Sequence, residues 1–354
     1  IGDLNGNDGP AFANNSDNSL HVVTAEGTES RAVLDGFVIT GGNACDENHF
    51  KRSNGGGLFC DHGNPTVIDC TFRGNYAGDH DGGGRGGAVY STQGNPSFDR
   101  CRFENNYAVA LDGGEGIGGA VSLDSGSVTL TECSFLGNVS GRDGGAVYCN
   151  ETDLKATHCL FSGNLARFGG SGSRGGAICA WAGNLTLSQC TFANNTALTK
   201  LDDPAADYGG ALFIGESTNL ILLHSVLWAN SARYGSQIAL TPYGVGSIIL
   251  HYCDIQGGYE GFGNVDVDPI FVKPGQWIGM NIQGNASSAA TEFLLWEPGD
   301  YHLMSQGGRW DAAAKTWVQD TVTSPCIDAG DPGALIMYEP FPNGGVVNMG
   351  AYGG

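Results

Sequence analysis

The feature that most constrains this chain is a repeat that opens with two glycines. Each copy continues with small or apolar residues and ends on an asparagine about twenty residues later. Six consecutive copies start at Gly55, Gly86, Gly118, Gly144, Gly175 and Gly209, and a degenerate seventh starts at Gly235. One copy cannot bury its own apolar residues, whereas stacked copies can, so the repeat predicts a solenoid.

Within each copy the apolar residues alternate over short runs that are interrupted by Gly, Asn and Pro, which indicates short strands and not helices. We therefore expect an all-β fold, a right-handed parallel β-helix of about seven to nine coils with a loop-rich C-terminal cap. Residues 1–31 are assigned to an N-terminal lead-in coil, 32–262 to the β-helix repeats, and 263–354 to a C-terminal cap region packed on the β-helix.

Stacked coils place equivalent residues in ladders, with a spacing of about 4.8 Å between neighbouring strands. The alignment predicts three ladders, of cysteine, phenylalanine and asparagine. The first contains Cys70, Cys101, Cys133, Cys159 and Cys190, continued by His224 and Cys253; the second contains Phe72, Phe103, Phe135, Phe161 and Phe192 and ends in Leu227; the third contains Asn75, Asn106, Asn138, Asn164, Asn195 and Asn230. Stacked amides at a corner can bond one another and the turn backbone.

Composition excludes several classes of protein. A net charge of −21 with only 16 Lys+Arg argues against a nucleic-acid partner, and a hydrophobic content of 41% argues against disorder. No run of 18 apolar residues is present, so no transmembrane segment is expected. The chain begins at Ile1 without an initiating Met, and we interpret it as a processed or trimmed fragment of something longer.

Two motifs carry a resemblance to known proteins. The GGA(V/I) and FxxN pairing resembles the repeats of bacterial polymorphic outer-membrane proteins and of the broader right-handed β-helix repeat family. The tail SPCIDAGDP…VNMGAYGG, Ser324 to Gly354, looks like the ending of large exported β-helix proteins of planctomycete type. The resemblance implies a bacterial protein that is secreted or on the cell surface. It leaves the activity open, because such families hold adhesins, lyases and hydrolases alike.

Eleven cysteines in an exported chain would ordinarily suggest disulfides. Five of them share one ladder, in which parallel neighbours point the same way, and this is poor geometry for a bridge. We expect a column of buried thiols that fills space beside the Phe ladder.

The repeats differ most between the asparagine and the next Gly-Gly, where insertions of variable length project from one flank of the solenoid. Charged residues gather there. If the chain is an enzyme, Arg85, Arg174 and Asp143 are the candidate catalytic residues, with Arg85 or Arg174 removing a proton in a polysaccharide lyase. Asp81, Asp112 and Glu115 would hold Ca²⁺, the cofactor such a lyase needs to neutralise a uronate. The alternative is that exposed loops simply carry solvating charges.

Aromatic residues beside this flank are the candidate substrate-binding groups. Phe59, Tyr90 and Tyr148 follow inward residues and are expected to face outward, and Trp181 lies on a nearby turn. Such a column could stack sugar rings along a groove, or the insertion loops could fold over it. Of the four tryptophans in the cap, Trp277, Trp296, Trp310 and Trp317, we expect core packing and not ligand stacking.

Two functions fit these features. The first is an exported bacterial cell-surface or extracellular-matrix protein, a non-catalytic scaffold or adhesin that engages polysaccharide, another surface or copies of itself. The second is a polysaccharide lyase or a glycoside hydrolase that acts in a loop-lined groove along the β-helix, the hydrolase needing a pair of carboxyl groups.

Overall fold

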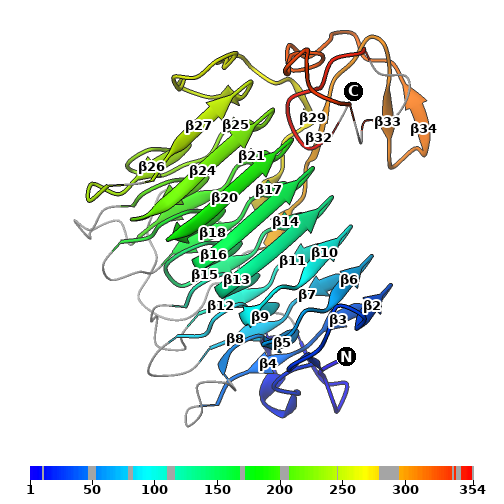
Figure 1. Ribbon diagram of the computed structural model, residues 1–354. Helices are drawn as coiled ribbons and strands as arrows, with labels where there is room; N and C mark the ends of the chain where they lie inside the picture. Colours follow the sequence, from blue (N-terminus) through cyan, green and yellow to red (C-terminus); the bar gives the residue numbers. More distant parts are fainter. Residues whose placement is uncertain are drawn as a thin grey trace.

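A computed structural model describes residues 1–9, 12–46, 53–78, 83–109, 116–167, 172–199, 207–244, 246–278, 295–336, 339 and 344–352. Each repeat forms one turn of a parallel β-solenoid, as predicted, and the turns follow one another from the N-terminal end to the C-terminal end of the molecule (Figure 1). A short 3-10 helix, Asn15–Asp17, precedes the first strand.

Each complete turn contributes strands to four stacks, all paired in parallel. The first stack begins at the Gly-Gly pairs and contains β1 (Val23–Thr24), β5 (Leu58–Asp61), β9 (Val89–Gly94), the start of β13 (Val121–Thr131), the start of β16 (Val147–Thr157), β19 (Ile178–Trp181), β23 (Leu212–Ile214) and β26 (Ile238–Leu240). The second stack contains β2 (Val33–Asp35), β6 (Thr66–Ile68), β10 (Ser97–Asp99), the ends of β13 and β16, β20 (Gly183–Ser188), β24 (Thr218–Leu223) and β27 (Ile248–His251). Because β13 and β16 run through both stacks, the two form one 14-stranded sheet.

The third stack is an eight-stranded sheet, and seven steps between its strands give about seven full turns. It contains β3 (Val38–Thr40), β7 (Thr71–Arg73), β11 (Arg102–Glu104), β14 (Ser134–Leu136), β17 (Leu160–Ser162), β21 (Thr191–Ala193), β25 (Val226–Trp228) and β28 (Asp254–Ile255). The fourth stack contains β4 (Asn43–Ala44), β8 (Tyr76–Ala77), β12 (Tyr107–Ala108), β15 (Val139–Ser140), β18 (Leu165–Arg167) and β22 (Thr196–Leu198).

The Gly-Gly pairs are required by backbone geometry. The first glycine of each pair has a positive φ, 65° at Gly175, which side chains disfavour. A Cβ on the second would collide with the next turn, since at Gly176 it would lie 2.2 Å from the carbonyl oxygen of Gly210. The pair therefore allows the chain to turn sharply between two closely stacked coils.

The predicted Phe and Asn ladders are confirmed. Neighbouring Phe rings from Phe72 to Phe192 stack with centroids 4.6–5.1 Å apart, the spacing of the strands themselves. In the Asn ladder each side-chain amide from Asn75 to Asn195 donates to the next asparagine and to a backbone carbonyl, and Asn230 donates to Gln237 instead. Asn138 Nδ2 lies 2.9 Å from both Asn164 Oδ1 and the Phe103 oxygen. These buried amides satisfy the backbone at the corner between the third and fourth stacks.

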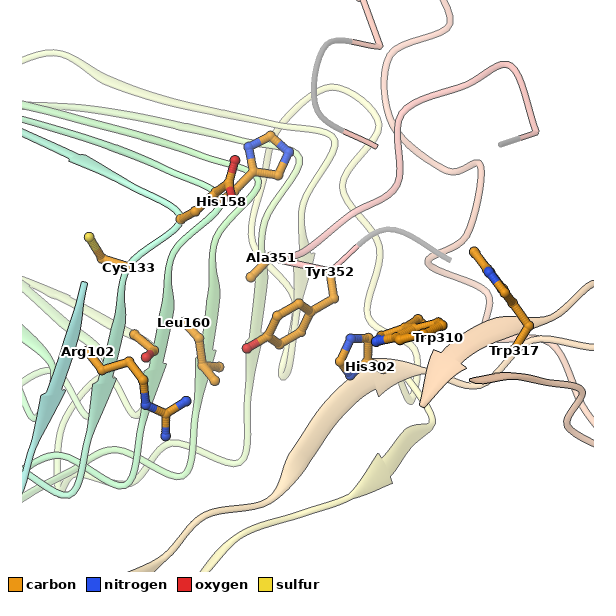
Figure 2. Close-up of a pocket in the computed structure, with 11 residues that line it drawn as sticks. Arg102, Cys133, His158, Leu160, His302, Trp310, Trp317, Ala351 and Tyr352 are labelled. Carbon is orange, nitrogen blue, oxygen red and sulfur yellow. The ribbon is translucent and has the colours of Figure 1, made fainter. Parts of the chain in front are cut away.

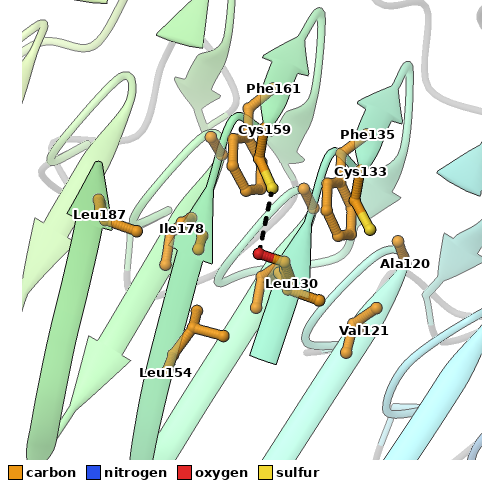
Figure 3. Packing of buried hydrophobic residues seen from close by; sticks show 14 of the residues in the cluster. Ala120, Val121, Leu130, Cys133, Phe135, Leu154, Cys159, Phe161, Ile178 and Leu187 are labelled. Carbon is orange, nitrogen blue, oxygen red and sulfur yellow. Dashed lines mark hydrogen bonds between the residues drawn. The ribbon is translucent and has the colours of Figure 1, made fainter. Parts of the chain in front are cut away.

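The cysteine ladder is confirmed with one correction. All eleven cysteines are free, and those of the ladder lie beside the Phe rings, their thiols bonded to backbone carbonyls (Figure 3). Burial raises the pKa of the Cys253 thiol to about 12. Ser225, not His224, fills the place between Cys190 and Cys253, because Thr191 pairs with Val226. His224 is instead the corner residue before it, with a φ of 48°.

The C-terminal region lies along the outer side of the third stack (Figure 1). Its strands form three antiparallel pairs: β29 (Phe271–Lys273) with β32 (Asp300–Leu303), β30 (Gln276–Ile278) with β31 (Leu295–Glu297), and β33 (Arg309–Asp311) with β34 (Thr316–Val318). Val265 also pairs with Asp254 at the last turn. The cap, residues 263–352 as far as they are described, is therefore a strap along the solenoid as well as a cover for its end.

Candidate functional site

The predicted catalytic residues lie on one line of the solenoid. The residues immediately before the Gly-Gly pairs form successive parallel bridges, which run Asn54, Arg85, Ile117, Asp143, Arg174, Tyr208 and Tyr234. Asp143 and Arg174 are neighbours in this ladder, and Arg85 lies two steps from Asp143 with Ile117 between them.

Asp143 and Arg174 are in direct contact. The Asp143 side chain is almost fully buried, and its Oδ2 accepts hydrogen bonds from Arg142 Nε at 2.9 Å and from an Arg174 amino group at 3.4 Å. Arg85 instead reaches Asp124 at 3.5 Å. The geometry brings two of the three predicted residues into one charge cluster and directs the third to another carboxylate.

The predicted cation ligands Asp81, Asp112 and Glu115 lie outside the described residues. Within the part of the chain that the structure describes, no group of three or more His, Cys, Asp or Glu side chains is placed to hold a metal ion.

The predicted aromatic ladder exists but is covered. Phe59, Tyr90 and Tyr148 occupy one outward ladder of the first stack, with Ser122 between Tyr90 and Tyr148. Phe59 and Tyr90 are only 2% and 3% exposed, whereas Tyr148 is partly exposed. A sugar could stack on Phe59 or Tyr90 only after whatever covers them had moved.

Trp181 is partly exposed at the edge of this ladder. The guanidinium carbon of Arg174 lies 5.6 Å from the Trp181 ring centroid and 5.8 Å from that of Phe213. This is the range of a cation–π contact, so Arg174 is held between the carboxylate of Asp143 and two aromatic rings.

A cleft opens on another side of the molecule, between the third stack and the cap (Figure 2). Its volume is about 540 Å³. The solenoid contributes Arg102, Glu132, Cys133, Ser134, His158 and Leu160, and the cap contributes His302, Trp310, Trp317, Ala351 and Tyr352. A space of this size falls within the usual range of ligand sites.

The cap wall of the cleft is fixed by packing next to it. Trp296 is 3% exposed and covers two glycines of the solenoid, so that a Cβ on Gly163 would lie 2.1 Å from its ring. The Tyr301 hydroxyl bonds Ser162 Oγ at 2.8 Å and Asn194 Oδ1 at 2.9 Å. The C-terminal tail is tied down as well, because the Ala351 N–H donates to Thr191 Oγ1 at 2.9 Å.

Aromatic rings dominate the cap side of the cleft. His302 and Tyr352 are stacked, with centroids 4.3 Å apart and planes within 19°. Trp310 and Trp317 face each other edge to face across the β33–β34 hairpin, 6.4 Å apart, and are 41% and 45% exposed. The expectation of core packing holds for Trp296 but is wrong for Trp310 and Trp317, because their hairpin projects beyond the solenoid surface.

Three ionisable groups that line the cleft, His158 and Arg102 of the solenoid and Tyr352 of the cap, differ in character. Burial lowers the pKa of His158 to about 4, so its imidazole is neutral at physiological pH. Burial also raises the pKa of Tyr352 to about 12, which keeps its hydroxyl protonated. Arg102 is exposed and donates through Nε to Glu104 at 2.8 Å. The cleft thus combines flat rings with a neutral imidazole, a phenol and one guanidinium.

A change in residue type along the repeats indicates where this cleft lies, but aligning the repeats by their shared residues did not reveal it. Outward residues of the third stack change from charged in TFR and RFE to apolar or small in SFL, LFS and TFA. That change marks where the cap begins to cover the sheet. The tryptophans themselves frame a short hairpin in RWDAAAKTWV, a pattern that places both rings on one side.

Two protein families match the chain. A family described as a right-handed β-helix region matches residues 80–265, and a family described as disaggregatase related matches residues 278–330. The second match includes the β33–β34 hairpin and its two tryptophans. No curated protein and no solved structure matches the chain significantly.

The two families fit a surface or extracellular β-helix protein. Over the residues that the structure describes, no helix has the length and apolar character to span a bilayer.

Proposed function

The chain belongs to the right-handed β-helix family, and we propose that it is an exported surface or extracellular protein that binds polysaccharide in the cleft between solenoid and cap. The observation that carries this proposal is the pair of exposed tryptophans, Trp310 and Trp317, on the wall of that cleft. The bacterial origin of the chain is part of the proposal and rests on the repeat and tail motifs.

Aromatic rings in an open cleft suit the chemistry of sugars. A pyranose ring presents an apolar face of C–H groups and a rim of hydroxyls, and an aromatic ring covers the first while nearby polar groups bond the second. Trp310 and Trp317 supply the rings, and polar atoms come from Arg102 and Ser134 of the solenoid and from Tyr352 of the C-terminal tail. The solenoid, and the cap attached to it through Tyr301 and Ala351, position these groups before the ligand arrives, which lowers the entropic cost of binding.

The cleft supports binding better than hydrolysis. Glycoside hydrolysis uses two carboxyl groups on either side of the bond that is cleaved. Among the described residues that line the cleft, Glu132 is the only aspartate or glutamate. We therefore propose a non-catalytic role as the first function, in which the chain acts as a scaffold or adhesin.

A catalytic role remains the second candidate, and one contact favours it. Arg174 and Asp143 meet on the flank where the insertions project, next to the partly exposed Trp181 and Tyr148. A polysaccharide lyase or glycoside hydrolase acting there would use Arg174 or Arg85, and Ca²⁺ would be its cofactor if Asp81, Asp112 and Glu115 supply ligands.

Binding is tested with a glycan panel measured by titration calorimetry. We expect the double variant Trp310→Ala/Trp317→Ala to lose at least about tenfold in affinity for the polysaccharide that the natural chain binds. Tyr243→Ala is the matched control, since Tyr243 is 82% exposed and lies outside the cleft. Equal affinity of the double variant and the control would show that the cleft is not the site.

Catalysis is tested on the same panel with and without Ca²⁺, by following new reducing ends and unsaturated uronate products. The scaffold proposal predicts that neither forms. Turnover that is lost in Arg85→Ala/Arg174→Ala would replace it with the lyase function. Turnover that survives this change would exclude the arginine flank as the active site.

A further inference from the structure

The cleft continues onto an open part of the same sheet. Beyond β14, the strands β11, β7 and β3 carry the third stack on toward the N-terminal end. In these three strands only the central residue is buried, and the residues on either side of it are exposed or partly exposed. In β14, β17 and β21, which the cap covers, all three residues are buried.

The open strands line up with the floor of the cleft. Strand pairing places Leu160, Ser134 and Arg102 in one outward ladder, and the next positions of that ladder are Thr71 and Val38. The first three residues line the cleft, and the last two lie beyond it. Neighbouring strands are about 4.8 Å apart, so the two steps from Arg102 to Val38 extend the ladder roughly 10 Å past Arg102. This length can hold further sugar units of a polymer whose end lies in the cleft.

Arginines gather on this open surface although the chain as a whole has a net charge of −21. Arg102 and Arg73 are exposed there, on neighbouring strands, and Arg100 lies at the adjoining corner. Arg100 is held by two carboxylates, Asp69 at 2.8 Å and Asp99, and Arg102 is held by Glu104. Within the described part of the chain, Arg73 forms no ion pair, so its five N–H donors face solvent.

From this continuity and this charge we propose that the cleft is one end of an extended track for an acidic polysaccharide, which runs over β11 and β7 with its carboxylates against Arg102 and Arg73. The inference rests on the proposed function, because the ligand first has to bind in the cleft. It adds the chemical class of the ligand, its direction along the solenoid axis, and a minimum length.

An acidic polymer fits the track better than a neutral one for a physical reason. A guanidinium presents a planar fork of donors that matches a carboxylate, and it is less strongly hydrated than an ammonium group. A carboxylate on the ligand would pair with Arg73 and compete with Glu104 for Arg102. Binding should therefore weaken as salt concentration rises, as expected for exposed ion pairs.

The track is tested with oligogalacturonides and oligomannuronates from dimer to octamer, and with cello-oligosaccharides of the same lengths as neutral probes. Quenching of tryptophan fluorescence and calorimetry report binding. We expect the affinity of the natural chain for at least one acidic series to rise with length beyond the trimer and then to level off.

Arg73→Ala should remove about tenfold of the affinity for long acidic oligomers and leave the shortest ones unchanged, because only the long ones reach β7. Arg102→Ala should weaken both. Arg31→Ala is the matched control, since Arg31 is an exposed arginine of the turn before β2. Circular dichroism checks that all three variants retain the fold.

Four outcomes would overturn the track: trimers that bind as tightly as octamers, an Arg73→Ala variant that behaves as Arg31→Ala, cello-oligosaccharides that bind as well as the acidic series, or no binding of either acidic series. Failure of the proposed function is separate from these. It would appear as full binding of every length by Trp310→Ala/Trp317→Ala, whatever the arginine variants do.

Discussion

The outward surface of the third stack is divided into a covered half, β14, β17 and β21, and an open half, β3, β7 and β11. The interior does not change between them, because the Phe and Asn ladders run through both. Only the outward residues differ: Leu136, Leu160 and Ala193 lie under the cap, whereas Arg73 and Arg102 face solvent. Inward residues therefore build the scaffold, and outward residues decide whether its surface is covered by the cap or left open to solvent.

The largest expected difference between the two halves is the loss of stability when equivalent glycines are replaced with alanine. Gly163 and Gly74 both have positive φ, 63° and 59°, but a Cβ would meet the Trp296 ring at 2.1 Å in the first and nothing closer than 3.9 Å in the second. We expect Gly74→Ala to cost about 1–2 kcal/mol from backbone strain, and Gly163→Ala about 3–5 kcal/mol. Urea unfolding followed by tryptophan fluorescence measures both. Equal costs would mean that Trp296 does not pack as the structure shows.

The interior should respond equally in both halves. Asn106 and Asn164 each donate to a backbone carbonyl and to the next asparagine, at 2.9–3.0 Å. Replacing either with Ala leaves buried partners unsatisfied, and we expect a cost of about 2–4 kcal/mol that differs little between the two variants. Chemical denaturation checks this. A much smaller cost for Asn106→Ala would show that the open half is held less tightly than its ladders imply.

The junction of cap and solenoid should depend on pH. Asp254 is fully buried and accepts the Cys326 thiol at 3.2 Å and the Val267 N–H at 3.1 Å. Burial raises its pKa from 3.8 to about 6, so the folded state favours the protonated acid. The stability gained is complete below pH 3.8 and is lost as the pH rises through 6, a change of about 3 kcal/mol.

Asp254→Asn should therefore remove a fall in stability that the natural chain shows between pH 4 and 7. Thermal unfolding across this range measures it. Glu260→Gln, an exposed change with the same loss of charge, controls for the overall negative charge and should leave the fall in place. A fall of the same size in Asp254→Asn would assign the pH dependence to other groups.

The smallest expected changes in stability come from removing a single polar side-chain group in each half. Tyr301→Phe removes hydroxyl bonds to Ser162, Asn194 and the Gly275 N–H under the cap and should cost about 1–2 kcal/mol. Arg102→Ala in the open half removes an exposed ion pair and should change stability by less than about 0.5 kcal/mol. Calorimetry of both variants tests the order, and a reversed order would contradict the division into covered and open halves.

The repeat made much of the fold predictable, but the assignment of His224 to the cysteine ladder was wrong. Cys190 is the sixteenth residue of its copy, whereas Ser225 is the seventeenth of the next, because one residue is added before β24. Cys190 and His224 are equally far from the first glycine of their copies, and for this reason the alignment assigned His224 to the ladder. Strand register, and not spacing from the Gly-Gly pair, decides which residue points inward.

The candidate site was less predictable. The alignment directed attention to the insertions and placed Arg85, Asp143 and Arg174 on one flank of the solenoid, and in the structure these three residues lie on one ladder of bridges. The expectation for Trp310 and Trp317 was core packing within the cap, whereas the two side chains are 41% and 45% exposed. Nothing local to RWDAAAKTWV states that the hairpin would project beyond the sheet, since that depends on where Trp296 and Tyr301 attach the cap.

The sequence alone determined the solenoid. Its glycines, alternating apolar residues and asparagines recur in each copy, and each of them packs against or bonds the equivalent residue one turn away. Only the tertiary structure decided which outward residues would be covered. The contacts that do so join residues 139 and 160 positions apart, Ser162 with Tyr301 and Thr191 with Ala351. No local period encodes such pairs, because they depend on how a non-repeating cap fits a repeating surface.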